Sequence, residues 1–269
     1  MAATDKTFAG SIPEIYDRFM VPLVFEPYAR DLAGRLANVE LRDVLETAAG
    51  TGVLTRAMAT ALPAQARITA TDLNQPMLDH AARARSDERI TWRQADALAL
   101  PFEDQSFDAV ACQFGAMFFP DKVLGYKEAR RVLKPGGHFF FNVWDKIAEN
   151  EFADVVTETL ATMFPNDPPR FLARIPHGYH DVATLREELT VASFAQVRIE
   201  TVGDISRAPS PREPAIAYCQ GTPLRNEIEA RDPAGLEAAT QACTEALALR
   251  FGSGPVEGRI SAHVITAIC

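Results

Sequence analysis

The sequence predicts an α/β fold built on a doubly wound, mostly parallel sheet. Three observations indicate this fold. Short apolar runs alternate along the chain with segments whose apolar residues recur at helical spacing, which is the pattern of strand–helix–strand units. The first apolar run turns sharply on Gly50 and Gly52 and continues into helix-forming residues. Hydrophobic residues make up 47% of the 269 residues, which is enough to bury a full core.

The segment before the first strand, residues 1–41, is predicted to be a short tail followed by two helices. Apolar residues recur at helical spacing from Ile12 to Phe19, and Pro22 interrupts the pattern. A second helix is expected over about residues 26–37.

Strands and helices then alternate along the chain. The predicted strands are residues 43–47, 67–72, 89–94, 107–113, 138–144, 194–202 and 259–268. The predicted helices are residues 54–62, 75–85, 122–133, 151–164 and 184–193, with a largely helical stretch over 208–251. The string 134–137 is expected to be a turn into the fifth strand. Because the seven-stranded sheet needs its last strand after residue 258, we expect the helices of 208–251 to be an insertion over the carboxyl ends of the strands.

Charge and cysteine usage argue against several classes of site. A net charge of −9 argues against a nucleic-acid duplex as substrate, because binding phosphates requires clustered Lys and Arg. No C-x-x-C pair supports a metal site or a disulfide framework; the cysteines are Cys112, Cys219, Cys243 and Cys269. The first residues lack the form of a signal peptide, and no apolar stretch reaches membrane-spanning length, so a cytoplasmic protein without a membrane span is expected.

The turn at Gly50 and Gly52 predicts a site for a nucleotide-like ligand. Glycine adopts positive φ without steric cost and lets the backbone approach a ligand closely. The helix that follows points unpaired N–H groups toward whatever lies over the turn. A dinucleotide fingerprint requires a third glycine where this chain has Thr55. An acid precedes the turn instead, in the frame Glu46-x-Ala48-x-Gly50-x-Gly52. An ordinary strand-to-helix turn in a nucleotide-free sheet is the alternative.

Asp72 ends the second strand, twenty positions beyond Gly52. An acid at the carboxyl edge of a parallel sheet can accept hydrogen bonds from both hydroxyls of a ribose. The alternative is that Asp72 caps the helix that begins after Asn74.

Three further strings follow in order. They are Gln94-Ala95-Asp96-Ala97 with the linker to Asp108, Cys112-Gln113-Phe114-Gly115-Ala116-Met117-Phe118-Phe119-Pro120-Asp121, and Arg131-Val132-Leu133-Lys134-Pro135-Gly136-Gly137. With the glycine frame and Asp72 they resemble, over residues 44–144, the motifs of the class I S-adenosylmethionine-dependent methyltransferases. The resemblance is strongest to the branch that contains the ubiquinone and menaquinone biosynthesis methyltransferases and their small-molecule relatives.

The resemblance implies a Rossmann-like core that binds S-adenosylmethionine, releases S-adenosylhomocysteine and methylates a small organic acceptor at O, N or C. Asp96 and Ala97 would recognise the adenine, Leu73 would lie against its face, and Met77 would lie beside the cofactor. The string after the fourth strand would lie beneath the sulfonium. The cofactor-binding residues so predicted are Tyr16, Phe25, Glu46, Ala48, Gly50, Thr51, Gly52, Asp72, Leu73, Met77, Asp96, Ala97, Gln113 and Met117.

The resemblance also implies a division of the chain. Residues 1–41, with the string that runs from Phe8 to Arg18, would be a helical arm over the pocket, and 42–144 the S-adenosylmethionine-binding core. Residues 145–269 would complete the sheet and carry helical lid insertions at about 145–190 and 205–257. A small-molecule substrate is expected as partner, without nucleic acid, and a homodimer is left open.

Methyl transfer needs few catalytic groups from the protein, because a sulfonium already contains an excellent leaving group. Methyl transfer by in-line displacement depends mostly on positioning in a pocket without water. His177 and His180 are the candidate general bases; solvated loop histidines are the alternative. Two other functions stay open. One is a module that holds the cofactor without turnover. The other is an NAD(P)-dependent oxidoreductase, which Thr55 and the lack of a Tyr-x-x-x-Lys string disfavour.

Overall fold

The computed structural model describes residues 12–84 and 87–269. The string at Phe8 and Gly10, predicted to belong to the arm, lies outside the described residues. The chain divides into two compact units. Unit 1 comprises residues 12–25, 144–179 and 203–261, and unit 2 comprises residues 26–143, 180–202 and 262–269.

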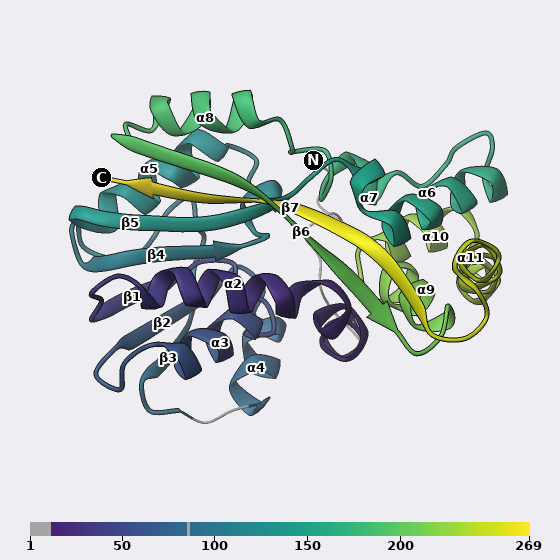
Figure 1. The fold of residues 1–269 in the computed structure, drawn as a ribbon, viewed down its shortest axis with the longest axis horizontal. Helices are drawn as coiled ribbons and strands as arrows, with labels where there is room; N and C mark the ends of the chain where they lie inside the picture. Colours follow the sequence, from purple (N-terminus) through teal and green to yellow (C-terminus); the bar gives the residue numbers. More distant parts are fainter. Residues whose placement is uncertain (1–11, 85–86) are drawn as a thin grey trace. The chain divides into compact units, whose positions relative to one another are not determined.

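A mostly parallel, seven-stranded mixed sheet confirms the predicted fold class (Figure 1). Its order is β3-β2-β1-β4-β5-β7-β6. The strands are β1 Asp43–Glu46, β2 Arg67–Asp72, β3 Ile90–Gln94, β4 Phe107–Gln113, β5 Leu133–Trp144, β6 Gln196–Ala208 and β7 Val256–Ile268. The pairs β3–β2, β2–β1, β1–β4 and β4–β5 are parallel. The carboxyl ends of these five strands therefore lie along one edge of the sheet, where the predicted motifs also end.

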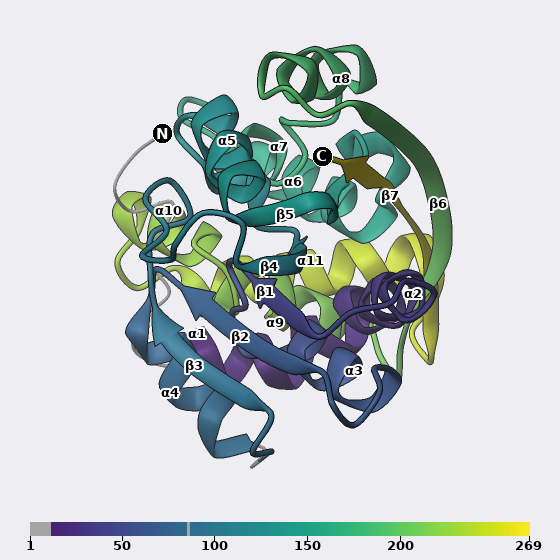
Figure 2. The ribbon, with the colours of Figure 1, turned by 90° about the vertical axis from the view of Figure 1, so that its left-hand side faces the viewer.

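Helices cover both faces of the sheet in unit 2. Figure 2 shows α2 (Glu26–Ala37), α3 (Val53–Ala61) and α4 (Gln75–Ala84) on one face, and α5 (Lys122–Val132) and α8 (Val182–Val191) on the other. The core on the first face is aliphatic: Leu32 and Leu36 of α2 and Met58 of α3 are fully buried. Each such side chain contributes about 1.5–3 kcal/mol on burial, so this face fixes α3 against the sheet. The glycine turn immediately precedes α3 and is fixed with it.

Unit 1 contains the remaining helices apart from a 3₁₀ turn at Ala116–Phe118, which lies in unit 2. They are α1 Ile12–Ile15, the π-helix Tyr16–Phe25, a 3₁₀ turn at Ile147–Glu149, α6 Glu151–Met163, α7 Phe171–Arg174, α9 Arg212–Gln220, α10 Leu224–Arg231 and α11 Leu236–Phe251. No helix of the described residues is both long and apolar enough to cross a membrane. The division into arm, core and lid stays a prediction.

Two local predictions are wrong. Pro22 does not interrupt the first helical segment, which continues as the π-helix to Phe25. Pro22 has no backbone N–H to donate, and the segment around it takes the π form, whose hydrogen bonds run to the residue five positions earlier, instead of ending. The turn expected at 134–137 is a bulge inside β5. Phe107 pairs with Leu133 and Ala109 with His138, so the residues between are accommodated without ending the strand.

Candidate functional site

The candidate site begins where β1 ends at the carboxyl edge of unit 2. Three residues of the turn have left-handed backbone: Ala48 (φ 54°), Gly50 (φ 56°) and Gly52 (φ 81°). Glycine is favoured at φ of this kind, whereas the alanine costs about 1–2 kcal/mol. A side chain at Gly52 would also meet the Trp92 ring, whose Cη2 lies 2.7 Å from the position of a Cβ. The turn thus combines strain at Ala48 with close packing at Gly52.

Asp72 joins this turn to the end of β2. Its Oδ2 accepts a hydrogen bond from the Gly50 N–H (2.9 Å), and its Oδ1 accepts from the Asn74 N–H (2.8 Å). Only 7% of Asp72 is exposed, and burial raises the pKa of its carboxyl in spite of these bonds. Asp72 therefore holds the glycine turn as well as the residues just before α4. The predicted ribose contact stays a prediction.

Glu46 is buried at the last position of β1. The Thr55 hydroxyl on α3 donates a hydrogen bond to Oε2 of Glu46 (2.5 Å). Burial raises the pKa of the Glu46 carboxyl to about 8, and the neighbouring Asp72 also raises it. Thr55, at the position of the missing third glycine, is therefore the partner of the acid, a role that the sequence did not reveal.

Two side chains complete the region of the glycine turn. Thr51 is buried, and among the described residues its hydroxyl oxygen has no hydrogen-bond partner. The Met77 methyl lies 3.6 Å from the place a Cβ on Gly50 would take. The predicted residues Thr51 and Met77 are therefore both brought to the turn.

The loops after β2 and β3 lie side by side. The Ala95 N–H donates to the Asp72 carbonyl (3.1 Å), and the Gln94 side chain donates to the Leu73 carbonyl (2.8 Å). Leu73 is 46% exposed, so its side chain is open to solvent at this edge of the sheet. Asp96 is exposed, its Oδ1 accepts the Leu98 N–H (2.9 Å), and the next residue is the half-buried Ala97.

The loop after β4 is strained. Phe114 has a left-handed backbone (φ 51°), and its N–H donates to Oδ1 (2.9 Å) and to the carbonyl (3.2 Å) of Asn142, at the carboxyl end of β5. Asn142 is fully buried, and among the described residues its Nδ2 has no hydrogen-bond partner. The predicted residues Gln113 and Met117 are buried on either side of Phe114. Sequence reasoning missed Asn142; its signal is a polar residue within an aromatic, buried strand.

Gly115 brings the loops after β1 and β4 into contact. A Cβ on Gly115 would collide with the Ala48 Cβ and lie 2.8 Å from the Cys112 sulfur. Gly115→Ala is therefore expected to lower the free energy of unfolding by about 1–3 kcal/mol. Ala48→Gly in the same chain should return part of this loss, because it removes one of the two obstructing groups. Urea unfolding of the wild type, both single variants and the double variant measures the coupling. Purely additive effects would contradict this contact.

The two candidate histidines have different surroundings. His177 is buried in unit 1, its Nδ1 lies 2.9 Å from the Asp145 carbonyl oxygen, and its ring packs on Trp144 (centroids 5.9 Å apart). Trp144 in turn packs on Phe25 (5.8 Å), which stacks on the half-buried Tyr16 (5.1 Å). His180 is half-buried in unit 2 and precedes Asp181, which caps α8. The structure thus places His177 in a buried aromatic cluster.

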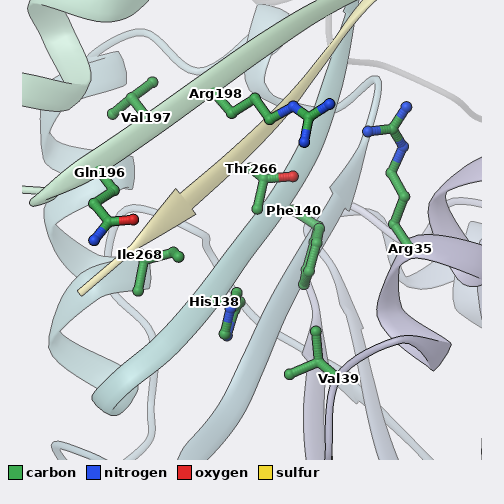
Figure 3. Close-up of a pocket in the computed structure, with 9 residues that line it drawn as sticks. All are labelled: Arg35, Val39, His138, Phe140, Gln196, Val197, Arg198, Thr266 and Ile268. Carbon is green, nitrogen blue, oxygen red and sulfur yellow. The ribbon is translucent and has the colours of Figure 1, made fainter.

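A hollow of about 400 Å³ in unit 2 lies away from these motifs (Figure 3). Its lining residues are Arg35, Val39, His138, Phe140, Gln196, Val197, Arg198, Thr266 and Ile268. Both guanidinium groups are already paired with one carboxylate: Arg35 lies 2.6 Å and Arg198 3.0 Å from Glu200. The hollow contains none of the predicted site residues.

Comparison with known proteins finds a family match over the strands that carry the predicted motifs. Residues 45–141 match the family model of a methyltransferase domain. The ubiquinone/menaquinone biosynthesis C-methyltransferase of Saccharophagus degradans is 29% identical over 168 residues, which cover 58% of this chain and 68% of that protein. The demethylmenaquinone methyltransferase of Staphylococcus aureus is 39% identical over 131 residues, 47% of this chain and 54% of that protein. The chain thus spans about half the length of the second relative.

A solved structure extends the likeness to the fold. The phosphoethanolamine N-methyltransferase 2 of Haemonchus contortus, in complex with S-adenosyl-L-methionine, superimposes with a TM-score of 0.63 at 16% identity, over 100% of this chain and 60% of that chain. The residues matched by the family model run from β1 into β5 and so contain the glycine turn, Asp72 and the loop after β4. The predicted resemblance is confirmed: residues 45–141 match a methyltransferase domain, and the chain is similar to the ubiquinone and menaquinone methyltransferase branch.

Proposed function

We propose that the protein transfers a methyl group from S-adenosylmethionine to a small organic acceptor. The observation that carries the proposal is the glycine turn, which Asp72 holds through the Gly50 N–H and which has the buried Thr51 hydroxyl beside it. A buried hydroxyl without a partner costs about 1–3 kcal/mol, and a polar ligand over the turn would relieve that cost. The relatives are named as methyltransferases of quinone biosynthesis, which supports a small-molecule acceptor.

The residues present fit this cofactor. We propose that Asp72 accepts from the ribose hydroxyls, that Leu73 lies against the adenine, and that Asp96 and Ala97 recognise its edge. The exposed Leu73 and the carboxylate of Asp96 lie on neighbouring loops, which supports this division of roles. Met77, Gln113 and Met117 are proposed to contact the sulfur end, where soft and polarizable side chains suit a cationic donor.

When bound, S-adenosylmethionine supplies an electrophilic methyl group on a sulfonium that leaves as a neutral thioether. The chain has to hold the acceptor in line with the methyl carbon and sulfur, and to keep water out. The turns at Ala48 and Gly115 pack closely against each other, so neither backbone can move without displacing the other. They therefore form a rigid surface for the proposed site. A rigid site of this kind promotes methyl transfer by positioning the reacting atoms rather than by acid–base chemistry.

We propose His177 as the general base where the acceptor has a proton to lose. A carbonyl oxygen only accepts hydrogen bonds, so the contact with Asp145 places the proton of the neutral ring on Nδ1. Nε2 is then the basic nitrogen of the ring. His177→Gln should lower kcat for hydroxyl or amine acceptors by about 10²–10⁴-fold with cofactor affinity unchanged. Equal kcat values for the variant and the wild type would rule out this role.

Calorimetry with S-adenosylmethionine, S-adenosylhomocysteine and NAD tests the cofactor preference. Both adenosyl ligands are expected to bind and NAD to bind more weakly, because Thr55 occupies the place of the third glycine that a dinucleotide fingerprint requires. Tight NAD binding with no heat from either adenosyl ligand would contradict the proposal. A chain that binds both adenosyl ligands but forms no S-adenosylhomocysteine with any small acceptor would instead be a cofactor-holding module.

We further propose that the N-terminal arm and residues 165–181 cover the cofactor. A reaction that excludes water needs a cover, and these segments are rich in aromatics and prolines, which lose little entropy on ordering. S-Adenosylhomocysteine should slow amide exchange at residues 12–25 and 165–181 more than in α3. Hydrogen exchange with and without the ligand measures this. Protection confined to residues 46–117 would mean that another segment forms the cover.

A further inference from the structure

The hollow in unit 2 is formed on one face of the strands β5, β7 and β6, which are neighbours in the sheet. Residues two positions apart on a strand share a face, and each strand contributes such a pair. The pairs are His138 and Phe140 of β5, Thr266 and Ile268 of β7, and Gln196 and Arg198 of β6 (Figure 3). His138 pairs in register with Ala109 near the start of β4, so the hollow lies toward the amino ends of the parallel strands and away from the glycine turn.

The hollow has the size and the apolar surface of a small-molecule site. Its volume is about 400 Å³, and ligand pockets usually measure about 300–1,000 Å³. A cavity of about 150 Å³ holds one benzene ring, so this hollow has room for a molecule of about two rings. Phe140 is buried in its lining, and Val39 and Ile268 are half-buried. The body of a ligand that fits here is therefore expected to be apolar.

Three polar side chains of the lining are available to a ligand. Within the described part of the chain, the His138 ring nitrogens, the Thr266 hydroxyl and the Gln196 amide form no hydrogen bond. The His138 ring stacks on Phe140, with the centroids 5.6 Å apart, and burial lowers the pKa of the ring, which favours its neutral form. A neutral imidazole, a hydroxyl and an amide can each donate and accept. A ligand with a hydroxyl or carbonyl group therefore finds partners here.

The charged groups at the rim of the hollow compensate one another. The Arg35 guanidinium lies 2.7 Å from Asp31 and 2.6 Å from Glu200, and the Arg198 guanidinium lies 3.0 Å from Glu200. Two positive groups thus face two carboxylates, without net charge. An anion would have to compete with Glu200 for the two arginines, and a cation would have to compete with the arginines for the carboxylates. A neutral ligand leaves these ion pairs intact.

We propose that the hollow binds a neutral compound of about two rings with a hydroxyl or carbonyl group. The volume determines the number of rings, the apolar lining favours the ring surface, and the three unbonded polar side chains accommodate the polar group. The compensated rim disfavours ionic ligands. The inference does not rest on the proposed function, because none of the lining residues belongs to the proposed cofactor site at the opposite ends of the strands.

NMR of the ¹⁵N-labelled full chain with 2-naphthol as the probe tests the inference. 2-Naphthol has two rings and one hydroxyl and is neutral at pH 7. Its binding is expected to shift the amide signals of residues 138–140, 196–198 and 266–268, with a Kd on the order of 0.1–1 mM. 2-Naphthoate has the same rings and a negative charge, and it should bind more weakly. Shifts confined to residues 46–117 would place the probe at the other edge of the sheet and overturn the inference.

Two substitutions of one lining residue test the site itself. Thr266→Val keeps the β-branched shape and removes the hydroxyl, so it should weaken 2-naphthol binding by about 2- to 12-fold, the range for one hydrogen bond. Thr266→Phe fills the hollow with a ring and should abolish the shifts. Thr91→Val is the control, because Thr91 is exposed on β3 at the opposite edge of the sheet, and it should bind like the wild type.

Three results would overturn the inference. They are 2-naphthoate binding as tightly as 2-naphthol, Thr266→Phe binding 2-naphthol like the wild type, and no shift at the three lining segments in the wild type. If Thr266→Phe does not fold, an unchanged affinity of Thr266→Val overturns the inference instead. The cofactor assignment is tested separately by S-adenosylhomocysteine, whose binding should be the same in Thr266→Val and in the wild type.

Discussion

The wild-type protein is expected to lose stability as the pH rises from 5 to 8, and Glu46→Gln is expected to lose much less. The folded-state pKa of Glu46, about 8, lies above its ordinary value of 4.5. A group whose folded pKa is raised contributes stability below its unfolded pKa and loses it as the pH rises through the folded pKa. Between pH 5 and pH 8 the free energy of unfolding of Glu46→Gln should therefore rise by about 3–4 kcal/mol relative to that of the wild type. Urea unfolding of the ligand-free protein at several pH values measures the difference.

Glu128→Gln is the matched control. The pKa of Glu128 is lowered by Arg131, so its contribution is present above the unfolded pKa and is lost only at acid pH. Between pH 6 and 8 this variant should differ from the wild type by a constant amount. A difference between Glu46→Gln and the wild type that is equally constant would show that Glu46 is ionised in the folded protein at neutral pH.

The central part of the fold was predictable because its signals are local. β2 and β4 have the predicted bounds, since each is a short segment between turn residues and is largely buried, β4 being mostly apolar and β2 rich in β-branched Ile and Thr. The bounds of β6 and β7 differ from the prediction by several residues. Their ends depend on pairing with strands that are distant in the sequence, and their alternating polar residues give no local stop signal.

The positions of the candidate site's acids and glycines at the strand ends were predictable, but the contacts that support them were not. Glu46, Gly50, Gly52 and Asp72 are defined by their places at strand ends, which the sequence pattern gives. Asn142 acts on Phe114, 28 positions earlier, and no local pattern links the two. The left-handed backbone at Ala48 likewise depends on a residue that is distant in the sequence. The Ala48 methyl group has room in this position only because Gly115 has no side chain. Contacts of this kind depend on three-dimensional packing, and a single sequence does not show them.

Asp72→Ala is expected to weaken cofactor binding by roughly 2–4 kcal/mol, or about 30- to 1,000-fold. Two charge-assisted hydrogen bonds to the ribose would be lost, each worth about 1.5–3 kcal/mol before water compensates. The variant should also lose stability, because the Gly50 and Asn74 N–H groups lose their acceptor. Calorimetry with S-adenosylhomocysteine gives the affinity, and urea unfolding of the same preparation gives the stability.

Asp108→Ala separates the two effects. Asp108 accepts two backbone hydrogen bonds through one oxygen, from the N–H groups of Arg42 (2.9 Å) and Asp43 (2.8 Å), at the amino edge of the same sheet. Its loss should therefore cost a similar amount of stability while leaving the affinity of the folded protein unchanged. If Asp72→Ala behaves in the same way, losing stability but binding S-adenosylhomocysteine as tightly as the wild type, Asp72 serves only to hold the turn and the helix start. The ribose would then need another acceptor at this edge, and the exposed carboxylate of Asp96 on the neighbouring loop would be the next to replace.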